Sequence, residues 1–140
     1  MIRLRQSVHD EMVAHAIAGV PNEACGLFVA DATAAEIPEV HGFYPMTNVA
    51  NSWKIYKLDP QEMLDVERQA DQAGHLIVGV MHSHTLSEAY PSPTDVADAT
   101  AFDPFGTWHF IIVSLKETEP RLRSFRIVDQ EITEEEVALV

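Results

Sequence analysis

Two histidines separated by one residue, His82 and His84, are the first feature of the sequence that points to chemistry. They follow an apolar run, residues 76–81, that predicts a buried strand. Because side chains two positions apart on a strand point to the same face, we expect both imidazoles to project together. Such a pair suits a divalent ion such as zinc, although a His-x-His at the end of a strand also occurs as a structural feature.

A carboxylate follows soon after this pair, in the segment Ser92-Pro93-Thr94-Asp95, which predicts the start of a helix. Two histidines and Asp95 would leave zinc an open fourth position, where a bound water has a pKa of roughly 7. In a second interpretation Ser92 caps the helix, Pro93 takes its first position and Asp95 completes a capping box. The two interpretations compete for the Asp95 carboxylate, and the sequence leaves both open.

The elements that must position these residues alternate along the first half of the chain and pair locally in the second half. Hydrophobic spacing, caps and breakers predict three helices. They are expected at 7–19 with a Ser7–Asp10 capping pair, at 60–73 with Asp59 as the cap and Glu62 completing a capping box, and at 93–101. Strands are expected at 25–30, 39–44, 76–84 and 108–115, and a hairpin at 122–128 and 131–133, before an acidic, solvated end from Glu134. This order predicts an α/β (α+β) fold, a mixed β-sheet flanked by helices.

Length and charge limit the classes of function that remain. A chain of 140 residues that is 46% hydrophobic can bury the core of one domain, spanning residues 1–140. A net charge of -13 disfavours binding to nucleic acids and to anionic membranes. One cysteine, Cys25, excludes an intramolecular disulfide, and we find neither a signal peptide nor an apolar run that spans a membrane. We therefore expect a cytoplasmic protein.

The spacing of the chemical residues resembles the metal motif of the JAMM (MPN-domain) metallopeptidases: His-x-His, seven residues, Ser, two residues, Asp. That family adds a glutamate before its first strand, and the segment 21–26 matches this region at Glu23. The resemblance implies a JAMM/MPN-like (cytidine-deaminase-like) architecture with one Zn²⁺ per chain. It also implies the roles of five residues: His82, His84 and Asp95 bind zinc, Glu23 transfers protons, and Ser92 stabilises the oxyanion. Thr85 departs from the proline that the family commonly has after the second histidine.

Within this family, the motif and the segments 45–48 and 125–129 resemble an actinobacterial subgroup that releases cysteine from a ubiquitin-like sulfur-carrier protein. The resemblance implies a hydrolase for the amide bond between cysteine and the C-terminal glycine of a carrier with a Gly-Gly tail, acting in cysteine biosynthesis. One alternative is a JAMM-type isopeptidase or peptidase acting on another ubiquitin-like conjugate. Two others are a non-catalytic MPN-type scaffold and a closed zinc site that includes Cys25. The oligomeric state stays open.

Other candidate residues are interpreted more simply. Trp53 and Tyr56 line a substrate groove or, as we prefer, pack against the second helix. Five further histidines have no partner at ligand spacing and are interpreted as surface or core residues: His9, His15, His41, His75 and His109.

Overall fold

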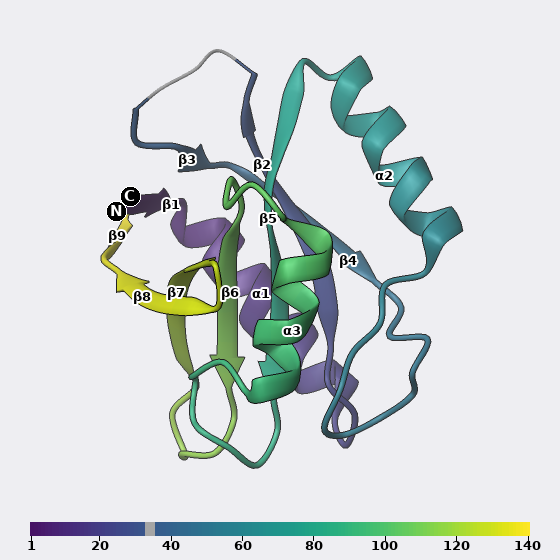
Figure 1. Ribbon diagram of the computed structural model, residues 1–140, viewed down its shortest axis with the longest axis vertical. Helices are drawn as coiled ribbons and strands as arrows, with labels where there is room; N and C mark the ends of the chain where they lie inside the picture. The colour runs from purple at the N-terminus through teal and green to yellow at the C-terminus, as the bar shows by residue number, and fades with distance from the viewer. Residues whose placement is uncertain (33–35) are drawn as a thin grey trace.

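The computed structural model describes residues 1–32 and 36–140 and contains a large and a small β-sheet (Figure 1). The large sheet has six strands in the order β4-β2-β5-β6-β7-β8. The pair β5–β6 is parallel and the other pairs are antiparallel, so the sheet is mixed, as expected. Its strands are β2 (Cys25–Asp31), β4 (Gly42–Met46), β5 (His75–His84), β6 (His109–Ser114), β7 (Arg121–Val128) and β8 (Glu131–Glu135).

The small sheet joins segments from both ends of the chain. Its order is β3-β1-β9, and both strand pairs are parallel. Figure 1 shows the two termini side by side at this sheet. The single strand expected at 39–44 is divided between the two sheets, as β3 and β4. The three strands of the small sheet are β1 (Ile2–Leu4), β3 (Glu39–Val40) and β9 (Val137–Leu139).

Three helices cover the large sheet on its two faces. In Figure 1, α1 (Gln6–Gly19) lies behind the sheet and α3 (Pro93–Phe102) lies in front of it. The helix α2 (Pro60–Gln72) packs on the same face as α3, since both helices contribute to one core cluster. The α1 layer buries Val8, Met12 and Ala16 against Phe28, Met81 and Ile111. The other layer buries Val66 and Ala99 against Leu27, Val80 and Phe110. The α+β class that the sequence predicts is thereby confirmed.

Three local expectations are wrong. Ser7 does not cap α1, because the helix begins one residue earlier and its N-cap, Arg5, makes no side-chain cap bond. Asp59 caps α2 as expected, but Glu62 accepts hydrogen bonds from Thr47 instead of completing a capping box. The acidic end is not fully solvated, because Glu135 lies on β8 and its side chain, only 5% exposed, contacts His109 at 2.6 Å.

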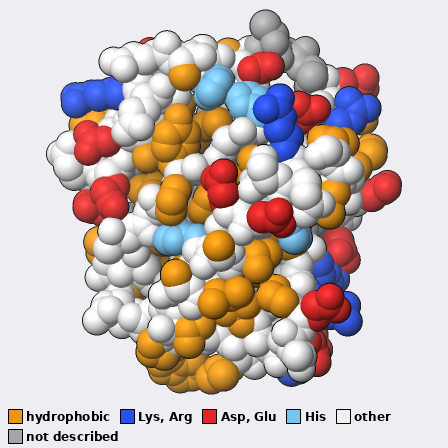
Figure 2. All heavy atoms as spheres, turned by 180° about the vertical axis from the view of Figure 1, so that it is seen from behind, with side chains coloured by type: hydrophobic (Ala, Val, Ile, Leu, Met, Phe, Trp, Pro, Cys, Tyr) orange, Lys and Arg blue, Asp and Glu red, His pale blue; other side chains and the backbone are white. Residues whose placement is uncertain are grey.

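The surface gives two further findings. Among the residues that the structure describes, no helix is long and apolar enough to cross a membrane. Figure 2 shows the molecule from behind, with hydrophobic side chains gathered over its lower part and several histidine side chains reaching the surface.

Candidate metal centre

The strand β5 carries both histidines to its carboxyl end and turns them toward α3. Period-two alternation places His82 and His84 on the same face, and both are buried. Their Nε2 atoms lie 3.1 Å apart. Between them, Ser83 is also buried, and its hydroxyl oxygen accepts the backbone N–H of Ala24 at 2.7 Å. This hydrogen bond ties the end of β5 to the segment that precedes β2.

The helix α3 brings the Asp95 carboxylate to the two imidazoles. A capping box forms as predicted: Ser92 Oγ accepts the Asp95 N–H at 3.1 Å, and Asp95 Oδ2 accepts the Ser92 N–H at 2.8 Å. The same Oδ2 atom lies 3.2 Å from His82 Nε2 and 3.0 Å from His84 Nε2. The expectation that capping and contact with the histidines compete for this carboxylate is therefore wrong. Both are met because the first turn of α3 lies directly over the end of β5.

These three side chains fit a zinc-like divalent ion. The edges of their triangle measure 3.1, 3.2 and 3.0 Å, whereas tetrahedral zinc with bonds of 2.0–2.1 Å separates its ligands by about 3.3 Å. His84 Nδ1 donates to the Glu88 carbonyl at 2.7 Å, which leaves the lone pair of its Nε2 facing the group. His82 is held differently: its ring stacks on Tyr56 at 4.4 Å, and its Nδ1 has no partner among the described residues.

The electrostatics of the three side chains, His82, His84 and Asp95, follow from this packing. Burial alone would raise the pKa of Asp95, but the hydrogen bonds from His82 and His84 outweigh it and hold the pKa well below its usual range. Burial likewise opposes a charge on His84, yet the bonds to Asp95 and to the Glu88 carbonyl raise its pKa. The group is thus built around an ionised carboxylate, which is the form that binds a cation.

Glu23 is buried although it lies in the turn before β2. Its side chain is only 4% exposed, and Oε1 has no hydrogen-bond partner among the described residues. Burial raises its pKa to about 8; the His84 charge lowers it and the Asp95 charge raises it. Two hydrogen bonds fix the backbone of Glu23: its N–H donates to the Ser52 carbonyl at 2.8 Å, and Asn48 Nδ2 donates to the Glu23 carbonyl at 3.0 Å. A carboxyl group with a pKa near neutrality suits proton transfer.

A cavity of about 250 Å³ joins these residues, with Glu23, His84 and Ser92 in its wall. Ser92 Oγ accepts the Asp95 N–H, so its own hydroxyl hydrogen can donate to a group in the cavity. Trp53 and Leu86, both more than half exposed, complete the apolar side of the wall. The fold therefore brings all five residues singled out in the sequence to one place: three line the cavity, and His82 and Asp95 contact His84.

Two neighbouring residues are clarified by the structure. Cys25 is a buried free thiol opposite His82 in the β2–β5 register, but it is not part of the metal-ligating group found among the described residues. Burial raises its pKa to about 12, so the thiolate that would bind zinc is disfavoured. Tyr56 lies in the core cluster that includes Val66 of α2, as preferred, and its ring also stacks on His82. The sequence carries no local signal for that stacking.

An α+β fold that buries two histidines, an aspartate and a free glutamate at the end of a strand has the features of a metal-dependent hydrolase. Residues 5–128 match the family described as prokaryotic homologs of the JAB domain, and the chain belongs to this family. The resemblance to the JAMM (MPN-domain) peptidases is therefore confirmed.

Similar proteins extend the comparison. The CysO-cysteine peptidase of Mycobacterium tuberculosis is 43% identical over 138 residues, covering 98% of this chain and 90% of that protein. The desampylase of Haloferax volcanii is 33% identical over 99 residues, covering 67% of this chain and 69% of that protein. A solution structure of a protein from Desulfitobacterium hafniense matches with a TM-score of 0.89 at 34% identity, over 100% of this chain and 93% of the other.

Proposed function

We propose that this chain is a zinc-dependent peptidase that cleaves the amide bond between cysteine and the C-terminal glycine of a ubiquitin-like sulfur-carrier protein. The observation that carries the proposal is the buried, unpaired Glu23 carboxyl beside the same cavity as the His82–His84–Asp95 group. The similarity to a CysO-cysteine peptidase over 98% of the chain supports the choice of substrate. In this proposal residues 1–140 form one metallopeptidase domain, which acts in cysteine biosynthesis in the cytoplasm.

The metal ligands would be His82, His84 and Asp95, one ion per chain. When bound, zinc acts as a Lewis acid that polarises the scissile carbonyl and activates a water molecule. The hydrogen bond from His84 Nδ1 to Glu88 keeps the ring in the orientation that a ligand needs. Stacking on Tyr56 does the same for His82. All three ligand side chains are buried.

Proton transfer falls to Glu23. Its carboxylate accepts a proton from the attacking water, whose oxygen forms the new bond to the glycine carbonyl carbon. The C–N bond then breaks, and Glu23 delivers the proton to the departing amine of cysteine. As negative charge develops on the carbonyl oxygen, the Ser92 hydroxyl donates a hydrogen bond to it. The products are the carrier with a free glycine carboxylate and free cysteine.

The carrier would present an extended Gly-Gly tail to this cavity. Trp53 and Leu86 offer apolar surface beside it, and glycines carry no side chain that would clash with a cavity of this size. A second candidate function, an isopeptidase for another ubiquitin-like conjugate, rests on the similarity to a desampylase. The two functions differ in the group that leaves the glycine, which is cysteine in one case and a lysine side chain in the other.

The test is mass spectrometry of a purified Gly-Gly-ended carrier that bears cysteine, incubated with zinc-loaded protein. We expect the wild type to remove one cysteine and Glu23→Gln to retain zinc but lose about 10²- to 10⁴-fold in rate. The matched control is Glu11→Gln, an exposed carboxylate on α1, which should act as the wild type. Full activity of Glu23→Gln would refute the mechanism. Equal rates on unrelated peptides, or a faster reaction on a lysine-linked conjugate, would refute the choice of substrate.

A further inference from the structure

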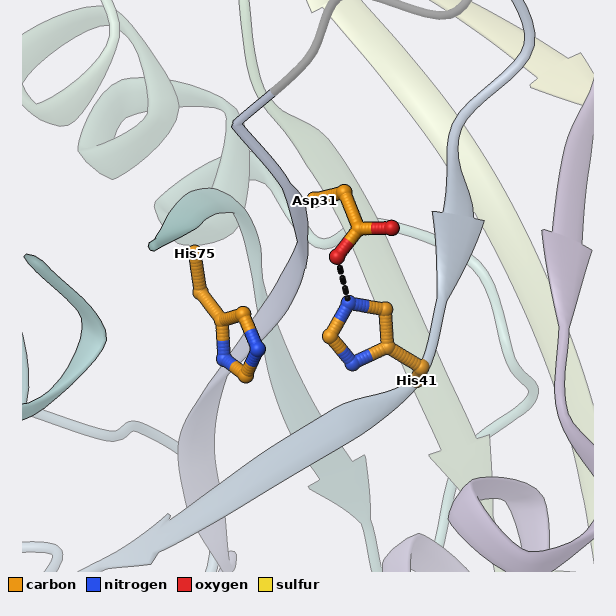
Figure 3. A group of neighbouring side chains, drawn as sticks. All are labelled: Asp31, His41 and His75. Carbon is orange, nitrogen blue, oxygen red and sulfur yellow. Dashed lines mark hydrogen bonds and ion pairs between the residues drawn. The ribbon is translucent and has the colours of Figure 1, made fainter. Parts of the chain in front are cut away.

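A second group of metal-ligating side chains lies at the other end of the β2–β5 strand pair. Asp31 ends β2 and His75 begins β5, and the two are partners in the antiparallel register. His41 stands in the turn between β3 and β4 and completes the group (Figure 3). From His75 to His84 the strand rises by about 3.3 Å per residue, so nine steps separate the groups by roughly 30 Å. The second group is therefore independent of the first.

The three side chains converge closely enough to share one ion. Each offers a ligand atom, and these atoms all lie within 4.8 Å of one another. His41 Nε2 lies 2.9 Å from Asp31 Oδ1, and the rings of His41 and His75 are 4.4 Å apart at 73°. Figure 3 shows a ring nitrogen of His75 pointing toward the Asp31–His41 pair. The Nδ1 atom of His75 is buried and has no hydrogen-bond partner among the described residues. No hydrogen bond therefore fixes which proton this atom carries.

A structural role does not account for this group. The Asp31 side chain is 72% exposed, and an exposed pair of this kind contributes only about 0–1 kcal/mol to stability even when it is fully charged. That pair does not involve His75, whose imidazole lies edge-on to a second imidazole. The chemical composition, two histidines and one aspartate, is the same as at the first centre, where a carboxylate oxygen also lies within hydrogen-bond distance of imidazole Nε2.

We propose that Asp31, His41 and His75 bind a second divalent transition-metal ion, for which Zn²⁺ is the ion used in the test below. Imidazole and carboxylate ligands together select this class of ion. In the hydrogen bond between the two side chains, His41 Nε2 donates a proton to Asp31 Oδ1, and the ion would take the place of that proton. Water molecules complete the coordination on the exposed side. Asp31 also lines a neighbouring cavity of about 360 Å³ with Glu36 and Glu39, and with Arg3 as the opposing charge.

The bound ion would tie together the ends of two strands and the turn before a third. Because the ligands are fixed in this arrangement only in the folded chain, binding stabilises the native state. The site is more exposed than the first centre, whose three ligands are all buried. We therefore expect its ion to exchange faster and to be removed first by a chelator.

The test is the number of zinc ions per chain, measured by elemental analysis and calorimetric titration after the metal has been stripped and Zn²⁺ returned. We expect two ions in the wild type, one in His41→Ala/His75→Ala, and one in His82→Ala. The matched control is His9→Ala, a histidine that also pairs with an aspartate, Asp10, at 3.0 Å but belongs to no metal-ligating group among the described residues. This control should keep two ions.

Each result decides the proposal. If His82→Ala binds no zinc, or if the His41→Ala/His75→Ala double variant binds as much zinc as the wild type, the second site does not exist. The result would differ if the first centre, His82–His84–Asp95, bound no zinc. In that case His82→Ala would bind as much zinc as the wild type, and the double variant would bind none. Asp31→Asn is a milder variant that should lose the same ion. Because the Asp31 side chain is 72% exposed, this substitution should not unfold the chain. Zinc should also raise the Tm of His82→Ala, and addition of the double substitution should abolish that rise.

Discussion

Asp95 has two roles in this structure, and replacement by asparagine separates them. Its Oδ2 accepts the Ser92 N–H at the start of α3 and also faces His82 and His84. In Asp95→Asn the amide oxygen can still accept the Ser92 N–H, so the cap of α3 is kept. The amide carries no charge and is a poor ligand for zinc. Ser92→Ala is the matched control, because it removes the capping hydroxyl and keeps the carboxylate.

The structure gives the size of each effect. Ser92→Ala loses the hydrogen bond from the Asp95 N–H to Oγ, which at an N-cap costs about 1 kcal/mol and lowers the Tm of a chain of this length by about 3–5 °C. Its zinc affinity should change little. Asp95→Asn should lower zinc affinity by at least about 100-fold, since loss of an outer partner of a metal ligand alone costs 10–100-fold.

The assay is a zinc competition titration against a chromophoric chelator, with thermal unfolding of the metal-free proteins recorded in parallel. We expect Asp95→Asn to lose zinc affinity and Ser92→Ala to keep it. If Asp95→Asn binds zinc as the wild type does, the carboxylate acts only as a cap. If Ser92→Ala loses as much affinity as Asp95→Asn, the helix start rather than the carboxylate governs binding.

Three further predictions concern residues around the two sheets. Burial opposes the charge of Glu135, but the bond from His109 at 2.6 Å outweighs it and lowers the pKa below its usual 4.5. The stabilisation that ionised Glu135 provides is fully present above pH 4.5 and is lost as the pH falls through its pKa in the folded protein. Glu135→Gln should therefore lower the free energy of unfolding by about 1–3 kcal/mol at neutral pH and flatten the acid limb of the urea-unfolding profile. An unchanged profile would contradict this. Tyr56→Ala should lower the free energy of unfolding by about 3 kcal/mol in the same assay, whereas Tyr56→Phe should lose little because it keeps the stacking on His82. Equal losses in the two variants would show that the aromatic ring does not hold His82 in place. Cys25→Ala should keep the zinc content of the wild type by elemental analysis, and loss of one ion would favour a closed site.

The residues of the first centre could be predicted because their geometry is local. Alternation along β5 sets His82 and His84 on one face, and the capping signal at Ser92 places Asp95 in the first turn of α3. What the sequence did not resolve was whether the cap excludes the metal role, since that depends on where α3 lies over the sheet. The proton-transfer role of Glu23 was implied only by the family resemblance, and its burial was not predicted, because a lone glutamate before a strand gives no local signal.

The second group could not be predicted because no part of it is local. Asp31, His41 and His75 come from separate segments, and the β2–β5 register together with the β3–β4 turn brings them together. The same holds for Glu135, which looked like part of a solvated acidic end. Pairing of β8 with β7 and β9 with β1 turns it toward His109. Long-range strand pairing, rather than residue type, decides both cases.

The most direct test of the central proposal is the release of free cysteine from the carrier–cysteine adduct, quantified before and after zinc is removed. We predict that the stripped protein releases none and that one equivalent of zinc at the His82–His84–Asp95 group restores the full rate. Cleavage at the same rate by the stripped protein, or no cleavage by protein with that centre loaded, would contradict the proposal.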